Sequence, residues 1–231
     1  MSAAEFAAYA AERWNLGPCL GVSESATAYV WIGGDVVVRV VRDTESAEQS
    51  ESVARRLAVA GVSVQRLAGM VPLRGGGWRA VAWVRCRGSQ GLASYADGCA
   101  WAEAILGLHS ARVDVARTGR GSSGTMGGSG SLVNSYMERC APQLLSVGLS
   151  HQDAHSRNVF VHHGKVTLID LDSLAVAPLW WDALELACEN AGRVAPEVLR
   201  GAHTALGLVD LTDDVIEEAR FLRRFYAANG L

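Results

Sequence analysis

The sequence predicts an α+β fold in which a small antiparallel sheet near the N-terminus precedes a mainly helical C-terminal part. Short runs of β-branched residues between positions 20 and 84 are separated by Gly-bearing turns, as is typical of antiparallel strands. From residue 94 onward, apolar residues recur at helical spacing. A second hairpin pattern, with two short apolar runs between polar clusters, follows at residues 159–169.

Length and composition favour a globular protein without bulk electrostatic attraction to nucleic acid or membrane. The chain has 231 residues, of which 49% are hydrophobic and 19% charged, and its formal net charge is −3. Its five cysteines form no CxxC pair, so neither a zinc site nor a disulfide framework is indicated, and we expect buried thiols in a reducing cytoplasm. The N-terminus lacks the pattern of a secretory signal, and no stretch is apolar enough to span a bilayer.

The N-terminal part is predicted to begin with an Ala-rich helix over Ser2–Trp14, which Gly17 and Pro18 end. A sheet then follows. Its expected strands are Leu20–Val22, Ala28–Ile32, Val36–Val41 and Ala80–Val84. A helix over Thr44–Ala60 lies between the last two strands and ends at Gly61.

Arg39 is the notable residue of the third strand, because it interrupts an otherwise apolar run, VVVRVV. A cation that faces inward has to find a partner. Glu48 and Glu51 on the following helix are the candidates, and an outward-facing Arg on a half-exposed strand is the alternative.

The C-terminal part is predicted to be mainly helical. The expected helices are Ser94–His109, Leu132–Val147, one beginning at about Leu179–Trp181, Pro196–Leu206 and Thr212–Ala228. The first two are separated by Thr118–Ser131, a Gly- and Ser-rich segment that fits a linker or a lid over a substrate.

One stretch, Leu149–Ser173, concentrates the polar chemistry of the chain. It contains His151, Asp153, His155, Asn158, Asp170 and Asp172. The predicted hairpin would bring the amide and the carboxylates to one end, where oxygen ligands can hold Mg²⁺ and a remaining carboxylate can accept a proton from a hydroxyl. These are the groups that phosphoryl transfer requires, although a surface hairpin with ordinary polar loop residues is the plain alternative.

Three segments of this region, HQDAHSRN, IDLD and APLWWDALELA, resemble the catalytic core of the aminoglycoside phosphotransferase and choline kinase-like family. The resemblance implies a two-lobed protein-kinase-like fold, with an N-lobe over residues 1–84 and a C-lobe over 85–231. It also implies that Asp153 is the catalytic base, that Asn158 and Asp170 are Mg²⁺ ligands, and that Asp182 braces the catalytic loop. Gln152 stands where the family usually has Gly.

The same resemblance assigns the remaining site residues. Asp172 is a further candidate metal ligand. His155 is grouped with Asp153 as a catalytic residue, and both His155 and His151 are expected to hold the loop.

In the N-lobe, the resemblance places Ser25 in a loop over the phosphates of ATP or GTP, and Arg39 at the α- and β-phosphates. Glu51 is expected to hold Arg39. Trp83 begins a hinge, residues 83–87, whose backbone would bind the adenine.

We therefore expect an ATP- and Mg²⁺-dependent transferase that phosphorylates a hydroxyl of a small molecule, antibiotic or natural product. The alternatives are a peptide- or protein-directed kinase of natural-product biosynthesis that works with a partner, and a catalytically silent binding module. A metal-dependent hydrolase is a weaker option. The acidic residues Glu185, Glu189, Glu197, Asp210, Asp213 and Asp214 suggest a pocket for a cationic acceptor.

Overall fold

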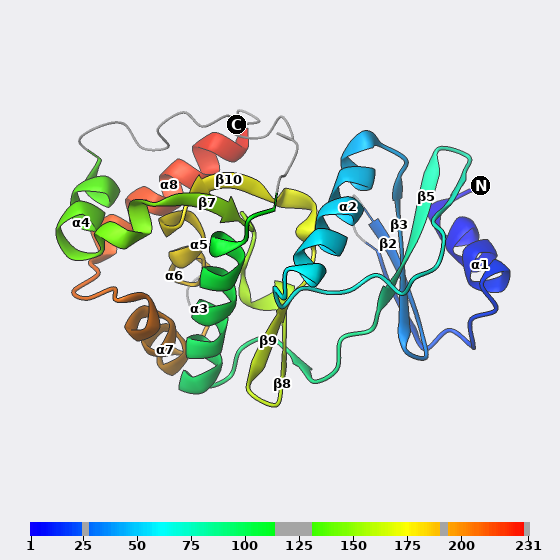
Figure 1. The fold of residues 1–231 in the computed structure, drawn as a ribbon, viewed down its shortest axis with the longest axis horizontal. Coiled ribbons are helices and arrows are strands. Elements are labelled where there is room, and N and C mark those ends of the chain that lie inside the picture. Colours follow the sequence, from blue (N-terminus) through cyan, green and yellow to red (C-terminus); the bar gives the residue numbers. More distant parts are fainter. Residues whose placement is uncertain (25–27, 114–130, 190–193, 229–231) are drawn as a thin grey trace. The chain divides into compact units, whose positions relative to one another are not determined.

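The computed structural model describes residues 1–24, 28–113, 131–189 and 194–228. The chain forms two compact units (Figure 1). The N-terminal unit comprises residues 1–58 and 64–86, and the C-terminal unit comprises residues 59–63 and 87–231. The expected α+β fold is confirmed, with an antiparallel sheet in the first unit and mainly helices in the second.

The N-terminal unit is built on a five-stranded antiparallel sheet with strand order β1-β2-β3-β5-β4. Its strands are β1 (Gly21–Glu24), β2 (Ala28–Gly33), β3 (Val36–Arg42), β4 (Leu73–Gly75) and β5 (Trp78–Val84). Strand β3 lies at the centre, between β2 and β5, and its consecutive valines place apolar side chains on both faces of the sheet.

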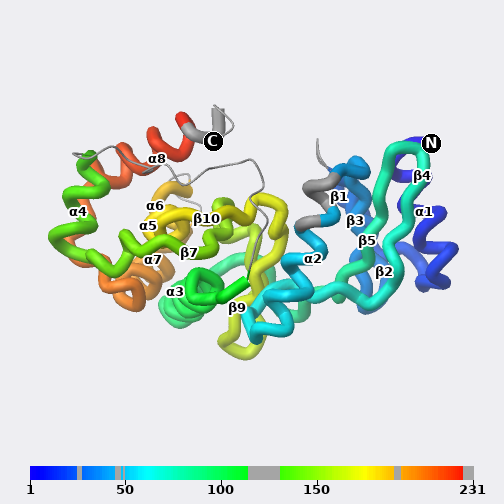
Figure 2. Tube along the Cα trace, turned by 45° about the horizontal axis from the view of Figure 1, so that its top comes forward, coloured from blue at the N-terminus to red at the C-terminus, as the bar shows by residue number. Residues whose placement is uncertain are grey.

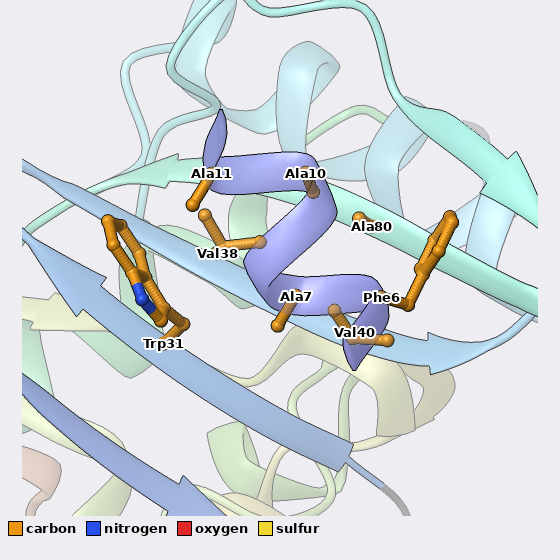
Figure 3. Packing of buried hydrophobic residues seen from close by; sticks show 8 residues of the cluster. All are labelled: Phe6, Ala7, Ala10, Ala11, Trp31, Val38, Val40 and Ala80. Atoms are coloured by element: carbon orange, nitrogen blue, oxygen red, sulfur yellow. The ribbon is translucent and has the colours of Figure 1, made fainter. Parts of the chain in front are cut away.

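Helix α1 (Ala3–Arg13) covers one face of this sheet (Figure 3). It begins at a capping box, in which the Ser2 hydroxyl accepts from the Glu5 amide and the Glu5 carboxylate accepts from the Ser2 amide. Its buried side is small, apart from one aromatic ring, so the helix can approach the strands closely. The packed residues are Phe6, Ala7, Ala10 and Ala11 of the helix with Trp31, Val38, Val40 and Ala80 of the strands.

Helix α2 (Glu45–Val59) lies on the opposite side of the sheet from α1 (Figures 1 and 2). Successive side chains of a strand point to opposite faces, so Arg39 faces away from the side on which Val38 and Val40 contact α1. The register pairs Arg39 with Val81 and Val41 with Arg79, which places both arginines on the face toward α2.

The C-terminal unit contains a close pair of helices, α3 (Tyr95–Ser110) and α7 (Pro196–Leu206). Ser94 caps α3 by accepting from the amide of Asp97, and Pro196 occupies the first turn of α7. A Cβ on Gly98 would lie 2.1 Å from the carbonyl oxygen of Val198, so only a glycine allows the two backbones to approach this closely.

The helix predicted over Leu132–Val147 is wrong beyond Cys140. Helix α4 covers Leu132–Cys140, and a 3₁₀ turn over Pro142–Leu145 follows. Pro142 cannot donate a backbone hydrogen bond and clashes with the preceding turn, which ends the α-helix. The chain then enters strand β7 (Val147–Ser150), which pairs with β10 (Ala175–Pro178) (Figure 2).

The hairpin predicted after the catalytic loop is confirmed. It consists of β8 (Val159–His162) and β9 (Lys165–Leu168), and a third short strand, β6 (Ser89–Gln90), pairs with β8. His163 and Gly164 form the two-residue turn with φ values of 49° and 70°, as a type I′ turn requires. The amide of Leu168, at the end of β9, donates to the carbonyl of Ser63 at 2.9 Å.

The C-terminal unit is completed by α5 (Trp180–Ala183), α6 (Glu185–Cys188) and α8 (Asp213–Ala228). Trp180 and Trp181 are buried in the core. Helix α8 packs against α4 and α6 (Figure 1). Within the described ranges, no helix is both long and apolar enough to cross a membrane.

Candidate active site

The predicted catalytic loop connects β7 to β8, and it brings Asp153 and Asn158 into direct contact. The amide nitrogen of Asn158 donates to the backbone carbonyl of Asp153 at 2.9 Å and to its carboxylate at 3.0 Å. Asn158 ends a short 3₁₀ turn over Ser156–Asn158, which turns its side chain back toward the loop. The contact fixes the amide, so its oxygen points away from Asp153.

Asp153 is accessible, as a group that receives a proton from a substrate must be. Its side chain is 46% exposed, and its carboxylate lies 3.7 Å from Nε2 of His155. The other ring nitrogen of His155, Nδ1, accepts from the amide of Arg157 at 3.1 Å. An accepting Nδ1 places the proton of a neutral imidazole on Nε2, so the ring presents a polar N–H toward Asp153.

Two contacts from outside the loop hold its start. The buried carboxylate of Asp182, 1% exposed, accepts from the amides of His151 at 2.7 Å and Gln152 at 2.9 Å. The fully buried ring of His151 bonds through Nε2 to the carbonyl of Ile169 at 2.9 Å. Helix α5 and the residue that follows strand β9 therefore both fix the residues before Asp153.

Gln152 has a left-handed backbone, with a φ of 68°. This conformation costs a residue with a Cβ about 1–2 kcal/mol, which explains why glycine suits this position. In this chain, the Gln152 side chain donates to the hydroxyl of Ser150 at 2.8 Å, a contact that glycine could not make.

Asp170 and Asn158 extend from adjacent chain segments, because the Ile169 amide donates to the Asn158 carbonyl at 2.9 Å. Asp170 has φ 59° and ψ 64°, and it precedes a 3₁₀ turn over Leu171–Ser173 that contains Asp172. This left-handed residue turns the chain sharply at the end of the hairpin.

The donor set fits Mg²⁺, since an amide oxygen and carboxylates are the hard ligands that this ion prefers. No group of three or more His, Cys, Asp or Glu in the described parts of the chain is arranged to hold a metal ion. An ion held by Asn158 and Asp170 would therefore complete its shell with water and phosphate oxygens, which is usual for Mg²⁺ in phosphoryl-transfer sites.

Two of the acidic residues suggested for a cationic acceptor make internal contacts instead. The Glu189 carboxylate accepts from both the amide and the hydroxyl of Ser156, at 3.0 and 2.6 Å, and so supports the turn before Asn158. The buried Glu185 carboxylate pairs with Arg223 of α8. These partners leave no local signal in the sequence, because each is more than thirty positions away from its carboxylate.

In the N-terminal unit, Glu51, which we expected to hold Arg39, pairs with Arg79. Its carboxylate accepts two hydrogen bonds from the Arg79 guanidinium, through Nε and, at 2.9 Å, through Nη2. Both side chains are buried, and the bond to Glu51 raises the pKa of Arg79 above its ordinary value. Sequence reasoning missed Arg79 because its position opposite Val41 depends on the pairing of β3 with β5.

Of the other predicted nucleotide contacts, Ser25 lies outside the described residues. Trp83 is 8% exposed, and its indole nitrogen has no partner in the described parts of the chain. Both backbone groups of Val84, in the expected hinge, are used within the unit: its amide donates to Arg66 and its carbonyl accepts from Gln65.

The comparisons with known proteins identify the fold. The family model for the phosphotransferase enzyme family matches residues 130–227, which include the catalytic loop and the hairpin. An aminoglycoside phosphotransferase, APH(3'')-Id, from Streptomyces rimosus superimposes with a TM-score of 0.68 at 15% identity, over 96% of this chain and 97% of that one. The chain has the fold of the aminoglycoside phosphotransferases.

Two further structures support this kinase-like fold. An aminoglycoside-3'-phosphotransferase of type VIII gives a TM-score of 0.67 at 17% identity, over 97% of this chain and all of that one. An amicoumacin kinase in complex with AMP-PNP, Ca²⁺ and Ami gives 0.61 at 14%, over 95% and 85%. No curated protein sequence matches the chain closely enough to count as a relative. The resemblance to aminoglycoside phosphotransferases is thus confirmed.

Proposed function

We propose that this protein transfers the γ-phosphoryl group of ATP to a hydroxyl of a small molecule, with Mg²⁺ as the metal. The observation that carries the proposal is the direct contact of Asp153 with Asn158 in a loop held by the buried Asp182. The match of residues 130–227 to the phosphotransferase enzyme family supports it. A cytoplasmic site of action fits the use of ATP.

Asp153 is the base of the proposed reaction. The acceptor oxygen attacks the γ-phosphorus, the bond from this phosphorus to the β,γ-bridging oxygen breaks, ADP leaves, and the hydroxyl proton passes to the Asp153 carboxylate. The amide of Asn158 donates to this carboxylate at 3.0 Å and fixes its orientation, and Nε2 of His155 lies 3.7 Å from its other oxygen. Mg²⁺ bound by Asn158 and Asp170 would neutralise charge on the phosphates.

An antibiotic or another natural product is the proposed class of acceptor. The similar structures include an amicoumacin kinase, a spectinomycin phosphotransferase and a macrolide 2'-phosphotransferase, so one fold serves chemically different compounds. Since Glu185 and Glu189 make internal contacts, they give no reason to restrict the acceptor to polycationic aminoglycosides.

The test is transfer of labelled γ-phosphate from ATP to a panel of aminoglycosides, macrolides and other hydroxyl-bearing antibiotics. We expect Asp153→Asn to lower turnover by about 10²–10⁴-fold, the usual contribution of a general base, while ATP still binds. Glu103→Gln is the control, because it makes the same acid-to-amide change at an exposed position of helix α3 and should leave turnover unchanged. Full activity of Asp153→Asn would show that Asp153 is not the base.

The metal assignment is tested with Asp170→Asn. The control is Asp210→Asn, at an exposed position. Asp170 and Asp210 both have positive φ, at 59° and 50°, and asparagine tolerates this conformation as well as aspartate. We expect thermal stabilisation by ATP with Mg²⁺ to be lost in the first variant and kept in the second. Stabilisation by ATP and Mg²⁺ without transfer to any acceptor would instead indicate a silent binding module.

A further inference from the structure

Helix α8 extends one side chain, Arg223, to the start of the catalytic loop. Its Nη2 donates to the backbone carbonyl of Gln152 at 3.3 Å, and its Nη1 donates to the carbonyl of Trp181 at 2.7 Å. The same guanidinium forms an ion pair with Glu185. The Arg223 side chain is only 13% exposed, so these contacts are shielded from water.

Arg223 thereby completes the set of contacts on a strained residue. Gln152 has a φ of 68°, its amide is bound by Asp182, and its side chain is bound by Ser150. The bond from Arg223 occupies the remaining backbone group, the carbonyl of the peptide that leads directly into Asp153. A strained residue keeps a rare conformation only when its surroundings fix it from several sides.

The charge of Arg223 is suited to this place. Burial lowers the pKa of its guanidinium to about 10, while the carboxylates of Asp182 and Asp153 act in the opposite direction. The group therefore stays charged at neutral pH.

We propose that Arg223 is a positioning residue for Asp153, which acts by holding the Gln152 carbonyl so that the left-handed turn persists with a glutamine in place of glycine. The inference rests on the proposed function, because positioning of Asp153 matters only if Asp153 acts on a substrate. It assigns a task to the last helix that no motif in the sequence indicates.

A cycle of three variants tests the coupling between these two positions. Arg223→Lys keeps the charge opposite Glu185 but loses the planar fork that reaches two carbonyls at once. We expect kcat to fall by about 10- to 100-fold with the KM for ATP nearly unchanged, because small displacements of a reacting group have effects of this size. In the Gln152→Gly background, where the turn needs less support, Arg223→Lys should lower kcat by less than about threefold.

Arg220→Lys is the matched control. Arg220 also belongs to α8 and donates to backbone carbonyls, but those of Ala187 and Cys188, which are not part of the loop. Its variant should keep wild-type kcat. An equal fall in kcat on Arg223→Lys in the wild-type and the Gln152→Gly backgrounds, or no fall in either, would overturn the proposal. If Arg223→Lys does not fold, Glu185→Gln/Arg223→Met replaces it in the cycle, since this pair leaves no buried charge unpaired.

Hydrogen exchange separates this proposal from the proposed function. Without nucleotide, Arg223→Lys should speed amide exchange in a peptide covering residues 150–155 by about tenfold or more, and Arg220→Lys should not. If Arg223→Lys speeds exchange but neither the wild type nor any variant transfers phosphate, the result would support the contact and count against the proposed function. Phosphoryl transfer with neither exchange nor kcat affected by Arg223→Lys would refute the positioning role alone.

Discussion

Replacement of Asp182 by asparagine is the sharpest test of how the catalytic loop is held. The carboxylate accepts from the amides of His151 and Gln152 with one oxygen each, at 2.7 and 2.9 Å, and it is 1% exposed. An asparagine keeps the shape of this side chain but retains only one acceptor. Its amide nitrogen would face one of the two backbone N–H groups, so one donor would be left buried without a partner.

The expected loss follows from these two contacts. One hydrogen bond to a charged group, worth about 1.5–3 kcal/mol, disappears, and leaving its donor buried costs about 1–3 kcal/mol, with some overlap between the two terms. We therefore expect Asp182→Asn to lower the free energy of unfolding by about 3 kcal/mol. For a chain of this size, that corresponds to a fall in Tm of roughly 6–12 °C.

Thermal unfolding followed by circular dichroism measures this effect, with Asp210→Asn as the control. The exposed Asp210 should change stability by less than about 0.5 kcal/mol. Hydrogen exchange should locate the loss of protection in residues 150–155. A variant of Asp182 that melts within about 2 °C of the wild type, with unchanged exchange in the loop, would refute the idea that this carboxylate holds the loop.

Two matched pairs of substitutions test packing elsewhere. Glu51→Ala should lower the free energy of unfolding by about 3–5 kcal/mol, because it leaves the buried Arg79 without its bidentate partner. Glu48→Ala, at a side chain that is 51% exposed, should lower it by less than about 1 kcal/mol. In helix α3, Gly98→Ala should destabilise by about 1–3 kcal/mol or more because its Cβ meets a carbonyl of α7, whereas Gly107→Ala should stabilise by about 0.5–1 kcal/mol. Urea unfolding measures all four, and equal effects within either pair would contradict the packing described.

Elements defined by neighbouring residues could be predicted from the sequence. The β8–β9 hairpin follows from two apolar runs joined by a tight turn. The helix over Ala3–Arg13 follows from its Ala-rich sequence and from Gly17 and Pro18 beyond it. The pairing of β7 with β10 could not be predicted in this way. It joins residues 147–150 to residues 175–178 across the whole catalytic hairpin, and a strand of four residues carries too little pattern to distinguish it from the end of a helix.

The difference between local pattern and long-range strand pairing also explains why Glu51 pairs with Arg79, a residue that the sequence did not indicate. The sequence indicated that a buried cation in the sheet would need an acidic partner from helix α2, and such a pair exists. The cation is Arg79 of β5, because Arg79 lies on the same face as Arg39 once β3 and β5 pair. Periodicity places a side chain on one face of its strand, but it does not say which strand will lie beside which.

The candidate site shows how far local sequence can describe a reaction. Asp153 and Asn158 are five positions apart, so the chemistry that we propose for them is visible in one short motif. The groups that fix their geometry come from elsewhere: Asp182 follows the loop by about thirty positions, and Arg223 by about seventy. Side chains of this kind need only reach one backbone group, so many positions in a chain could supply them, and no characteristic spacing results. The glutamine at position 152 makes their contribution measurable, because glycine would hold the same turn with less support.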